Sequence, residues 1–107
     1  EGLPMAHFYL ATAFYKGLGV QKNHGKALDH MLRAAERNLG TAHKTCSQFF
    51  AHGVGDPDRL PNWKKAAEHA GRAEALGVPG AAELFRQYDL KRQETETEPA
   101  VRRIEIG

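Results

Sequence analysis

Apolar residues recur at helical spacing near the start of the chain. Ala6, Leu10 and Phe14 stand at positions i, i+4 and i+8, so they form one stripe along a helix. The stripe predicts a helix over residues 3–16 whose three apolar side chains face inward and pack against neighbouring helices.

The same pattern returns 36 residues later, with Ala42, Cys46 and Phe50 in the same order. A glycine-rich turn follows each stripe, beginning at Gly17 in the first copy and at Gly53 in the second. Glycine allows the backbone conformations that a tight connection needs. A constant offset of this length predicts two copies of one structural unit.

Each glycine turn leads to a second helix, predicted over residues 24–38 and 63–76. Asn23 and Asn62 directly precede these ranges, where a side-chain oxygen can accept a hydrogen bond from an unpaired N–H of the first turn. Asn38 is expected to end the former helix in the left-handed conformation. The two capping asparagines are 39 residues apart, because three residues are inserted in the second loop. The packing face of the former helix consists of small residues and one methionine: Ala27, Met31, Ala34 and Ala35.

A fifth helix is predicted over residues 79–92. Ala81 and Phe85 take the places of Ala42 and Cys46 in the second stripe. Asp89 stands where the apolar stripe would continue. A charged residue there favours a last helix that faces solvent, as the end of a repeat array requires. Residues 93–107 are polar and are expected to form a flexible tail. The alternative is a short segment that docks on a surface.

With both turns in place, residues 2–82 resemble the Sel-one-like repeat family, which are solenoid relatives of the tetratricopeptide repeats. The first unit carries most of the family pattern: Gly2, Ala6, Leu10, Ala11, Phe14, Gly17-Leu18-Gly19-Val20, Lys26-Ala27 and Arg33-Ala34-Ala35. The second unit keeps a shorter set: Ala42, Phe50, Gly53-Val54-Gly55, Lys65-Ala66 and Arg72-Ala73. The chain departs from the family where an aromatic pair usually follows Lys-Ala, since His30-Met31 and His69-Ala70 stand there instead.

The resemblance implies an all-α fold, an α-solenoid of antiparallel helix pairs that form a right-handed superhelix. Two repeats at about residues 2–37 and 38–76 would be followed by the capping helix. The resemblance also implies an adaptor or scaffold, with no catalytic residues to carry over. We therefore expect a protein–protein interaction module without enzymatic activity or cofactor. The alternative is a regulatory or immunity-type protein that inhibits a partner enzyme or toxin by occluding its site.

In such stacks the first helix of each pair lines the concave side, so residues beside the packing stripe are expected to bind a protein or peptide partner. They mix aromatic rings, which bury area, with polar groups, which fix register. The predicted residues are Phe8, Thr12, Tyr15 and Lys16, then Lys44, Gln48 and His52, then Glu83, Gln87 and Lys91. The alternative for Phe8 and Tyr15 is that they pack against an upstream repeat or helix.

Six histidines raise the question of a metal site, but none are spaced as His-x3-His, so no metal is predicted. His30 and His69 occupy equivalent places in the two units and are expected to approach one another across the stack. Polar packing is the favoured interpretation of that pair, with a metal-binding or proton-sensing pair as the alternative. Cys46 stands in the apolar stripe, so we expect a buried structural thiol rather than a catalytic one, even with His43 one turn before it.

Composition narrows these interpretations only slightly. The 107 residues form one domain or a fragment of a longer array. The net charge of +2 comes without a long basic run, so nucleic acid is not an expected partner. The single cysteine excludes an internal disulfide and leaves both cytoplasm and periplasm open. No apolar run is as long as a membrane span, and no stretch has the pattern of a signal peptide. The oligomeric state is left open.

Overall fold

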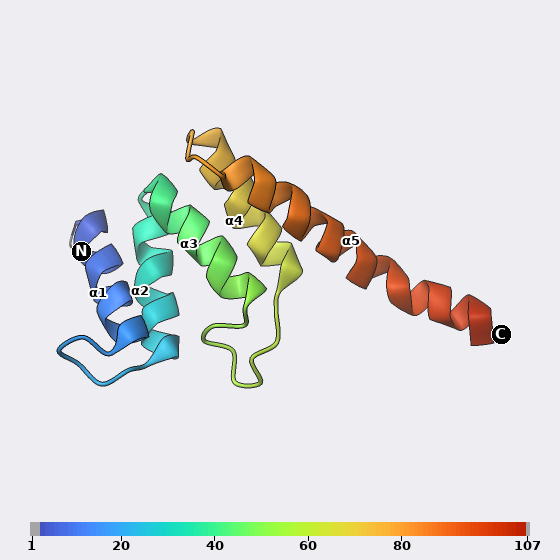
Figure 1. The fold of residues 1–107 in the computed structure, drawn as a ribbon, viewed down its shortest axis with the longest axis horizontal. Helices are drawn as coiled ribbons and strands as arrows, with labels where there is room; N and C mark the ends of the chain where they lie inside the picture. Colours follow the sequence, from blue (N-terminus) through green and yellow to red (C-terminus); the bar gives the residue numbers. More distant parts are fainter. Residues whose placement is uncertain (1–2, 107) are drawn as a thin grey trace.

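The structure, a computed structural model, describes the backbone of residues 3–106 and the side chains of residues 3 and 5–96. This part of the chain forms five helices and no strand, which confirms the all-α prediction. The helices are α1 (Pro4–Lys16), α2 (His24–Glu36), α3 (Gly40–Ala51), α4 (Trp63–Ala75) and α5 (Ala81–Ile106). Each packs against the next in sequence order, and α3 also contacts α5 (Figure 1). The result is an elongated body with extents of 54 × 31 × 21 Å.

The predicted caps are present at the starts of α2 and α4. The Asn23 side chain accepts a hydrogen bond from the Lys26 N–H at 3.0 Å, and Asn62 accepts from the Lys65 N–H at 3.1 Å. Asn38, directly after α2, has a φ of 61°. This is the predicted left-handed conformation, so local chemistry alone places these helix ends.

The buried core is made mostly of alanine. One cluster joins α1, α2 and α3, and the other joins α3, α4 and α5; Phe50 packs against both. Small side chains allow helix axes to approach closely, so contact between backbones replaces bulky side-chain packing. The fully buried alanines are Ala11, Ala27, Ala34, Ala42, Ala66, Ala70, Ala73 and Ala81.

The predicted inward stripe of the first helix is only partly inward. Phe14 packs against the core, but Ala6 and Leu10 are exposed. The equivalent residues of α3, Ala42 and Cys46, are fully buried because α2 lies against them. Among the described residues, no helix precedes α1 to cover its stripe in the same way.

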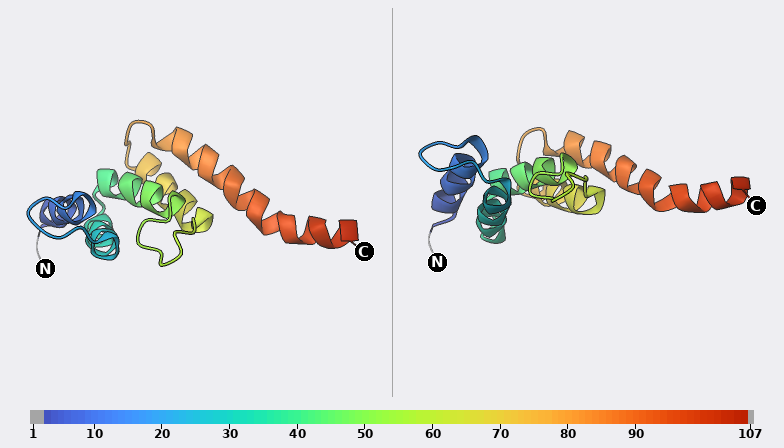
Figure 2. Two further views of the ribbon diagram at one scale, coloured as in Figure 1. Left: turned by 60° about the horizontal axis from the view of Figure 1, so that its bottom comes forward. Right: turned by 90° about the horizontal axis from the view of Figure 1, so that it is seen from below.

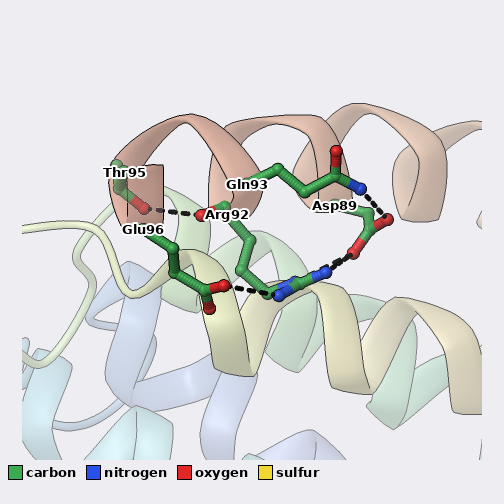
Figure 3. A network of polar contacts seen from close by, with 5 residues as sticks. All are labelled: Asp89, Arg92, Gln93, Thr95 and Glu96. Carbon is green, nitrogen blue, oxygen red and sulfur yellow. Dashed lines mark hydrogen bonds and ion pairs between the residues drawn. The ribbon is translucent and has the colours of Figure 1, made fainter. Parts of the chain in front are cut away.

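The last helix is longer than predicted. The sequence suggested an end near residue 92 and a tail thereafter, whereas α5 continues to Ile106 and extends beyond the other helices (Figures 1 and 2). Glutamate and arginine are good helix formers, and they make helix-spaced contacts here. Figure 3 shows Arg92 between Asp89 and Glu96, at 2.8 and 2.9 Å, while Gln93 also donates to Asp89. Whether the segment is mobile or docks on a surface stays a prediction, and residues 1, 2 and 107 lie outside the described chain.

The two glycine turns are equivalent in position but differ in their surroundings. Gly17 and Gly53 both end a helix with positive φ, 74° and 70°. A Cβ on Gly53 would lie 2.3 Å from the carbonyl oxygen of Arg59, because the longer second loop folds back over it. A Cβ on Gly17 would meet only Lys22, at 3.4 Å. The second glycine is therefore required by both backbone conformation and space.

We expect Gly53→Ala to destabilise the protein far more than Gly17→Ala. The left-handed backbone alone costs a non-glycine residue about 1–2 kcal/mol, which is the whole expected effect at Gly17. At Gly53 the overlap with backbone raises the loss of unfolding free energy to about 3–5 kcal/mol. Urea unfolding followed by circular dichroism measures both. Equal losses for the two variants would contradict the observed course of the second loop.

Candidate functional site

The residues predicted to contact a partner lie on α1, α3 and α5, with His52 directly after α3. Contacts within the chain join the three helices at these residues. Tyr15 of α1 stacks on Phe49 of α3 with ring centroids 5.1 Å apart. Lys44 of α3 donates a hydrogen bond of 2.9 Å to the carbonyl oxygen of Pro79, just before α5. These two contacts connect α1 to α3 and α3 to the segment before α5; that the predicted residues form one surface stays a prediction.

The same contacts engage several of the predicted residues. Phe8 packs against the core, and its carbonyl oxygen accepts a hydrogen bond of 3.0 Å from the Thr12 hydroxyl. Tyr15 also stacks on His24, with centroids 5.0 Å apart, and keeps 37% of its surface exposed. The two predicted aromatic anchors, Phe8 and Tyr15, therefore already pack against other residues of the chain, and only part of each ring could contact a partner.

The exposed remainder of the predicted surface is polar. On α5, Glu83 accepts hydrogen bonds from Arg86 and from Gln87. Gln48 is half-buried. Besides Tyr15, the exposed members of the predicted set are Lys16, His52, Glu83, Gln87 and Lys91. Partner binding at these positions stays a prediction.

The histidines form two pairs that the sequence interpretation missed. His7 meets His30, and His43 meets His69, each between a first helix and the helix that follows it. The predicted approach of His30 to His69 is wrong: each points toward the first helix of its own pair. The sequence contains a signal for these pairs: His7 and His43 are 36 residues apart, as the first helices of the two units are, and His30 and His69 are 39 apart, as the second helices are.

Both pairs have the same edge-to-edge geometry. The Nδ1 atoms are 3.1 Å apart in His7–His30 and 3.0 Å apart in His43–His69. The ring centroids are 5.3 and 5.2 Å apart. In each pair the centroid distance exceeds the distance between the Nδ1 atoms by 2.2 Å, which is close to twice the radius of an imidazole ring. The two Nδ1 atoms therefore lie near the line between the ring centres, as a straight hydrogen bond requires.

This geometry restricts protonation. One ring must carry hydrogen on Nδ1 and donate it, while the other carries hydrogen on Nε2 and accepts. If both rings were fully protonated, two N–H groups would face each other. Each pair can thus hold at most one extra proton without separating.

An aromatic ring and a lysine complete the same arrangement in both helix pairs. Phe14 lies nearly parallel to His30 with centroids 5.7 Å apart, and Phe50 lies in the same way beside His69 at 5.6 Å. A lysine ammonium sits near each phenylalanine ring, Lys26 Nζ at 5.4 Å and Lys65 Nζ at 5.5 Å from the centroid. We call each set of lysine, phenylalanine and two histidines a histidine column.

The electrostatics favour neutral imidazoles, most strongly in the second column. Burial lowers the pKa of His69 to about 4, assisted by His43, Arg72 and Lys65. Burial also lowers the pKa of His43, with Arg72 acting in the same direction and the carbonyl of Ala35 against it.

In the first column, burial and then His7 lower the pKa of His30. The predicted buried thiol is confirmed, since Cys46 is fully buried and burial raises its pKa to about 12.

A cavity of about 270 Å³ lies beside the second column, between α2, α3 and α4. Its walls include both histidines of that column, with Glu68 and Arg72 of α4. His43 is only 3% exposed, and its Nε2 has no hydrogen-bond partner among the described residues.

This arrangement can take up a proton, but it offers no metal centre. Within residues 3–96, no three or more histidine, cysteine, aspartate or glutamate side chains are arranged to hold a metal ion. Each Nδ1 is already committed to the other ring of its pair. The chemistry of the columns is therefore that of neutral, hydrogen-bonded imidazoles.

Comparison with family models, with curated proteins and with solved structures finds no match to this chain. The resemblance to Sel-one-like repeats therefore rests on the residues quoted above and stays a prediction. None of the described helices combines the length and apolar character needed to cross a membrane.

We expect the protein to lose stability as the pH falls below about 6.5. Unfolded histidine titrates near 6.5, whereas His69 in the fold titrates near 4, so the folded state binds fewer protons between these values. The contribution is complete above pH 6.5 and is lost progressively as the pH falls toward 4. Because His69 is only partly buried, a loss on the order of 1–2 kcal/mol between pH 7.5 and pH 5 is expected. Urea unfolding at the two pH values measures it.

His69→Asn separates this effect from general acid sensitivity. The asparagine amide can still form a hydrogen bond with His43 Nδ1, but it does not titrate, so the pH-dependent loss should shrink. His52→Asn, at an exposed position outside the columns, should leave the loss unchanged. A wild-type pH dependence in the His69 variant would show that the column is not its source.

Proposed function

We propose that the chain is a protein–protein interaction module, an adaptor or scaffold built as an α-solenoid of two helix-pair repeats and α5. One observation carries the proposal: the histidine column is built twice, from residues that recur after 36 positions in the first helix of each pair and after 39 positions in the second. Four side-chain positions, their ring contacts and the His–His hydrogen bond all recur. Recurrence of a detailed contact set supports duplication of one unit better than helix content alone does.

The backbone supports the same proposal. The N–H of Asn23 donates to the carbonyl oxygen of Phe14 at 2.9 Å, and the N–H of Asn62 donates to that of Phe50 at 2.8 Å. Each loop therefore returns to the same point of the preceding helix, although the second loop is three residues longer. Units that repeat in this way present equivalent faces side by side, which gives an extended surface for a partner.

The chemistry of that surface favours a polar protein or peptide segment. Lys16 and Lys91 are exposed, and the ring of Tyr15, which stacks on Phe49 and His24, keeps part of its surface open to a partner. Such a surface fixes register through hydrogen bonds and gains energy from one aromatic contact. The buried thiol, with its raised pKa, does not supply a nucleophile, which supports binding rather than catalysis.

Site-specific photo-crosslinking in the native host tests the proposal. A photo-reactive phenylalanine analogue at position 52 or 87 should form an adduct of defined mass with one partner, because both positions are exposed on the predicted side. The control is the same analogue at position 74, which is exposed on α4. The adduct should decrease when an excess of the unlabelled chain is added.

A competitor variant sharpens the result. An unlabelled chain carrying Lys16→Glu, His52→Glu and Lys91→Glu should compete at least about tenfold less well, since it reverses or adds charge on the proposed surface without touching the core. Adducts at position 74 alone, or none, would contradict the proposed surface. If the captured partner is an enzyme that the chain inhibits one to one, the regulatory alternative is favoured instead.

A further inference from the structure

The cavity beside the second histidine column is lined by a buried residue with an unpaired nitrogen atom. His43 is 3% exposed, and its Nε2 lacks a hydrogen-bond partner in the described part of the chain. A buried polar atom without a partner costs about 1–3 kcal/mol. The cavity measures about 270 Å³. It is therefore much larger than one water molecule, whose share of liquid volume is about 30 Å³.

An arginine without a counter-charge lines the same cavity. The side chain of Arg72, on α4, forms no ion pair or hydrogen bond with any other residue that the structure describes. Arg33 stands 39 positions earlier, at the equivalent place of the first unit, and pairs with Asp29 at 3.3 Å. The equivalent of Asp29 is Glu68, which lines the cavity but does not pair with Arg72. The guanidinium of Arg72 therefore has its N–H groups available, and two of them match the two oxygens of a carboxylate.

The charges that act on the two imidazoles are positive. Burial is the main cause of the lowered pKa of His43 and of His69, and Arg72 lowers both values further. Lys65 acts on His69 in the same direction. No carboxylate is among the groups that shift either pKa. The histidine side of the cavity therefore lacks negative charge, which a bound anion would supply.

Two glutamates also line the cavity, on its outer side. Glu36, the last residue of α2, and Glu68 are exposed, whereas Leu32 and Ala35 are partly or fully buried and form an apolar wall. Water and salt screen exposed charges. The two glutamates therefore oppose a bound anion only weakly, and they weakly favour a proton on the histidines.

The histidine pair gains a second donor when it takes up one proton. In the neutral pair one ring carries hydrogen on Nδ1 and the other carries it on Nε2, so one Nε2 is bare. The added proton binds to that bare Nε2. Both Nε2 atoms then carry hydrogen, whichever ring donates across the Nδ1–Nδ1 contact. The protonated pair carries one positive charge and is a better partner for an anion than the neutral pair.

We propose that this cavity binds a carboxylate group together with one proton, which the pair of His43 and His69 takes up from the solvent. The carboxylate accepts hydrogen bonds from the guanidinium of Arg72 and from Nε2–H of His43. The apolar wall of Leu32 and Ala35 contacts the carbon atoms of the ligand. The carboxylate belongs to a free organic acid or to an acidic residue of a protein segment. None of the residues predicted to bind a partner lines this cavity, so the inference is independent of the proposed function.

Nuclear magnetic resonance titration of the imidazole Hε1 protons tests this site. The probe is sodium acetate, and sodium chloride at equal ionic strength is the control. The signals of His43 and His69 should shift and saturate with acetate only. Because binding takes up a proton, the dissociation constant for acetate should be about 5- to 10-fold lower at pH 5.5 than at pH 7.5. Equal shifts with chloride, no saturable shift, or acetate binding that does not depend on pH would overturn the proposal.

A matched pair of arginine variants tests the geometry. Arg72→Gln should weaken acetate binding at pH 5.5 by at least about tenfold, because charge-assisted hydrogen bonds are lost. Arg33→Gln, at the equivalent position of the first unit, should leave the acetate constant unchanged. Both arginines are exposed, so the fold should tolerate either change. Equal acetate binding by the two variants would overturn the proposal.

A histidine variant tests the origin of the proton. His69→Asn cannot share a proton across the pair, so acetate binding should depend less on pH than in the original chain. A full pH dependence in this variant would contradict proton uptake by the histidine pair.

Two capped tripeptides distinguish the sources of the carboxylate. If Ala-Glu-Ala binds more tightly than acetate, the ligand is an acidic residue of a protein segment. If acetate binds as tightly or more tightly, the ligand is a free organic acid. Ala-Gln-Ala should not bind, and equal affinity for the two peptides would overturn the proposal. Crosslinking at positions 52 and 87 probes residues outside the cavity, so failure of this site and failure of the proposed function are separate results.

Discussion

Close approach of helices through buried alanine is the constraint on which this structure depends. Alanine removes little apolar area from water, far less than the leucine or phenylalanine side chains that gain about 1.5–3 kcal/mol each on burial. Its advantage is that it permits dense packing between backbones. A larger residue at Ala42 or Ala66, both fully buried, would separate the helices along their whole length. Stability that is not supplied by alanine must come from the rings at the edges of the contact.

The histidine columns contribute to that stability. Imidazole is an aromatic ring that can fill space between helices, but its nitrogen atoms must be satisfied when it is buried. Two histidines that bond to each other satisfy one nitrogen of each ring without reaching a third helix, while Nε2 of His43 has no hydrogen-bond partner among the described residues. The solution requires neutral rings. The same contact that holds α3 to α4 therefore makes the pair of helices sensitive to acid, because of His43 and His69.

Features that depend on neighbouring residues in the sequence could be predicted, whereas features that depend on contacts between helices could not. The caps at Asn23 and Asn62 depend on neighbouring atoms only, and they are as predicted. The approach of His30 to His69 was wrong because equivalent residues in successive units are displaced copies that point the same way. Residues that meet come from different helices of one pair. The end of α5 was missed because a Glu-rich sequence is typical of both disorder and an exposed helix, and the ion pairs of Arg92 favour the helix.

The predicted concave residues and the exposed leucines of the first unit would contribute to binding in different ways. Polar side chains such as Lys16 and Gln87 exchange hydrogen bonds with water for bonds with a partner, so they add selectivity more than affinity. Exposed Leu10 and Leu18 gain free energy from any apolar cover, but they select only for shape.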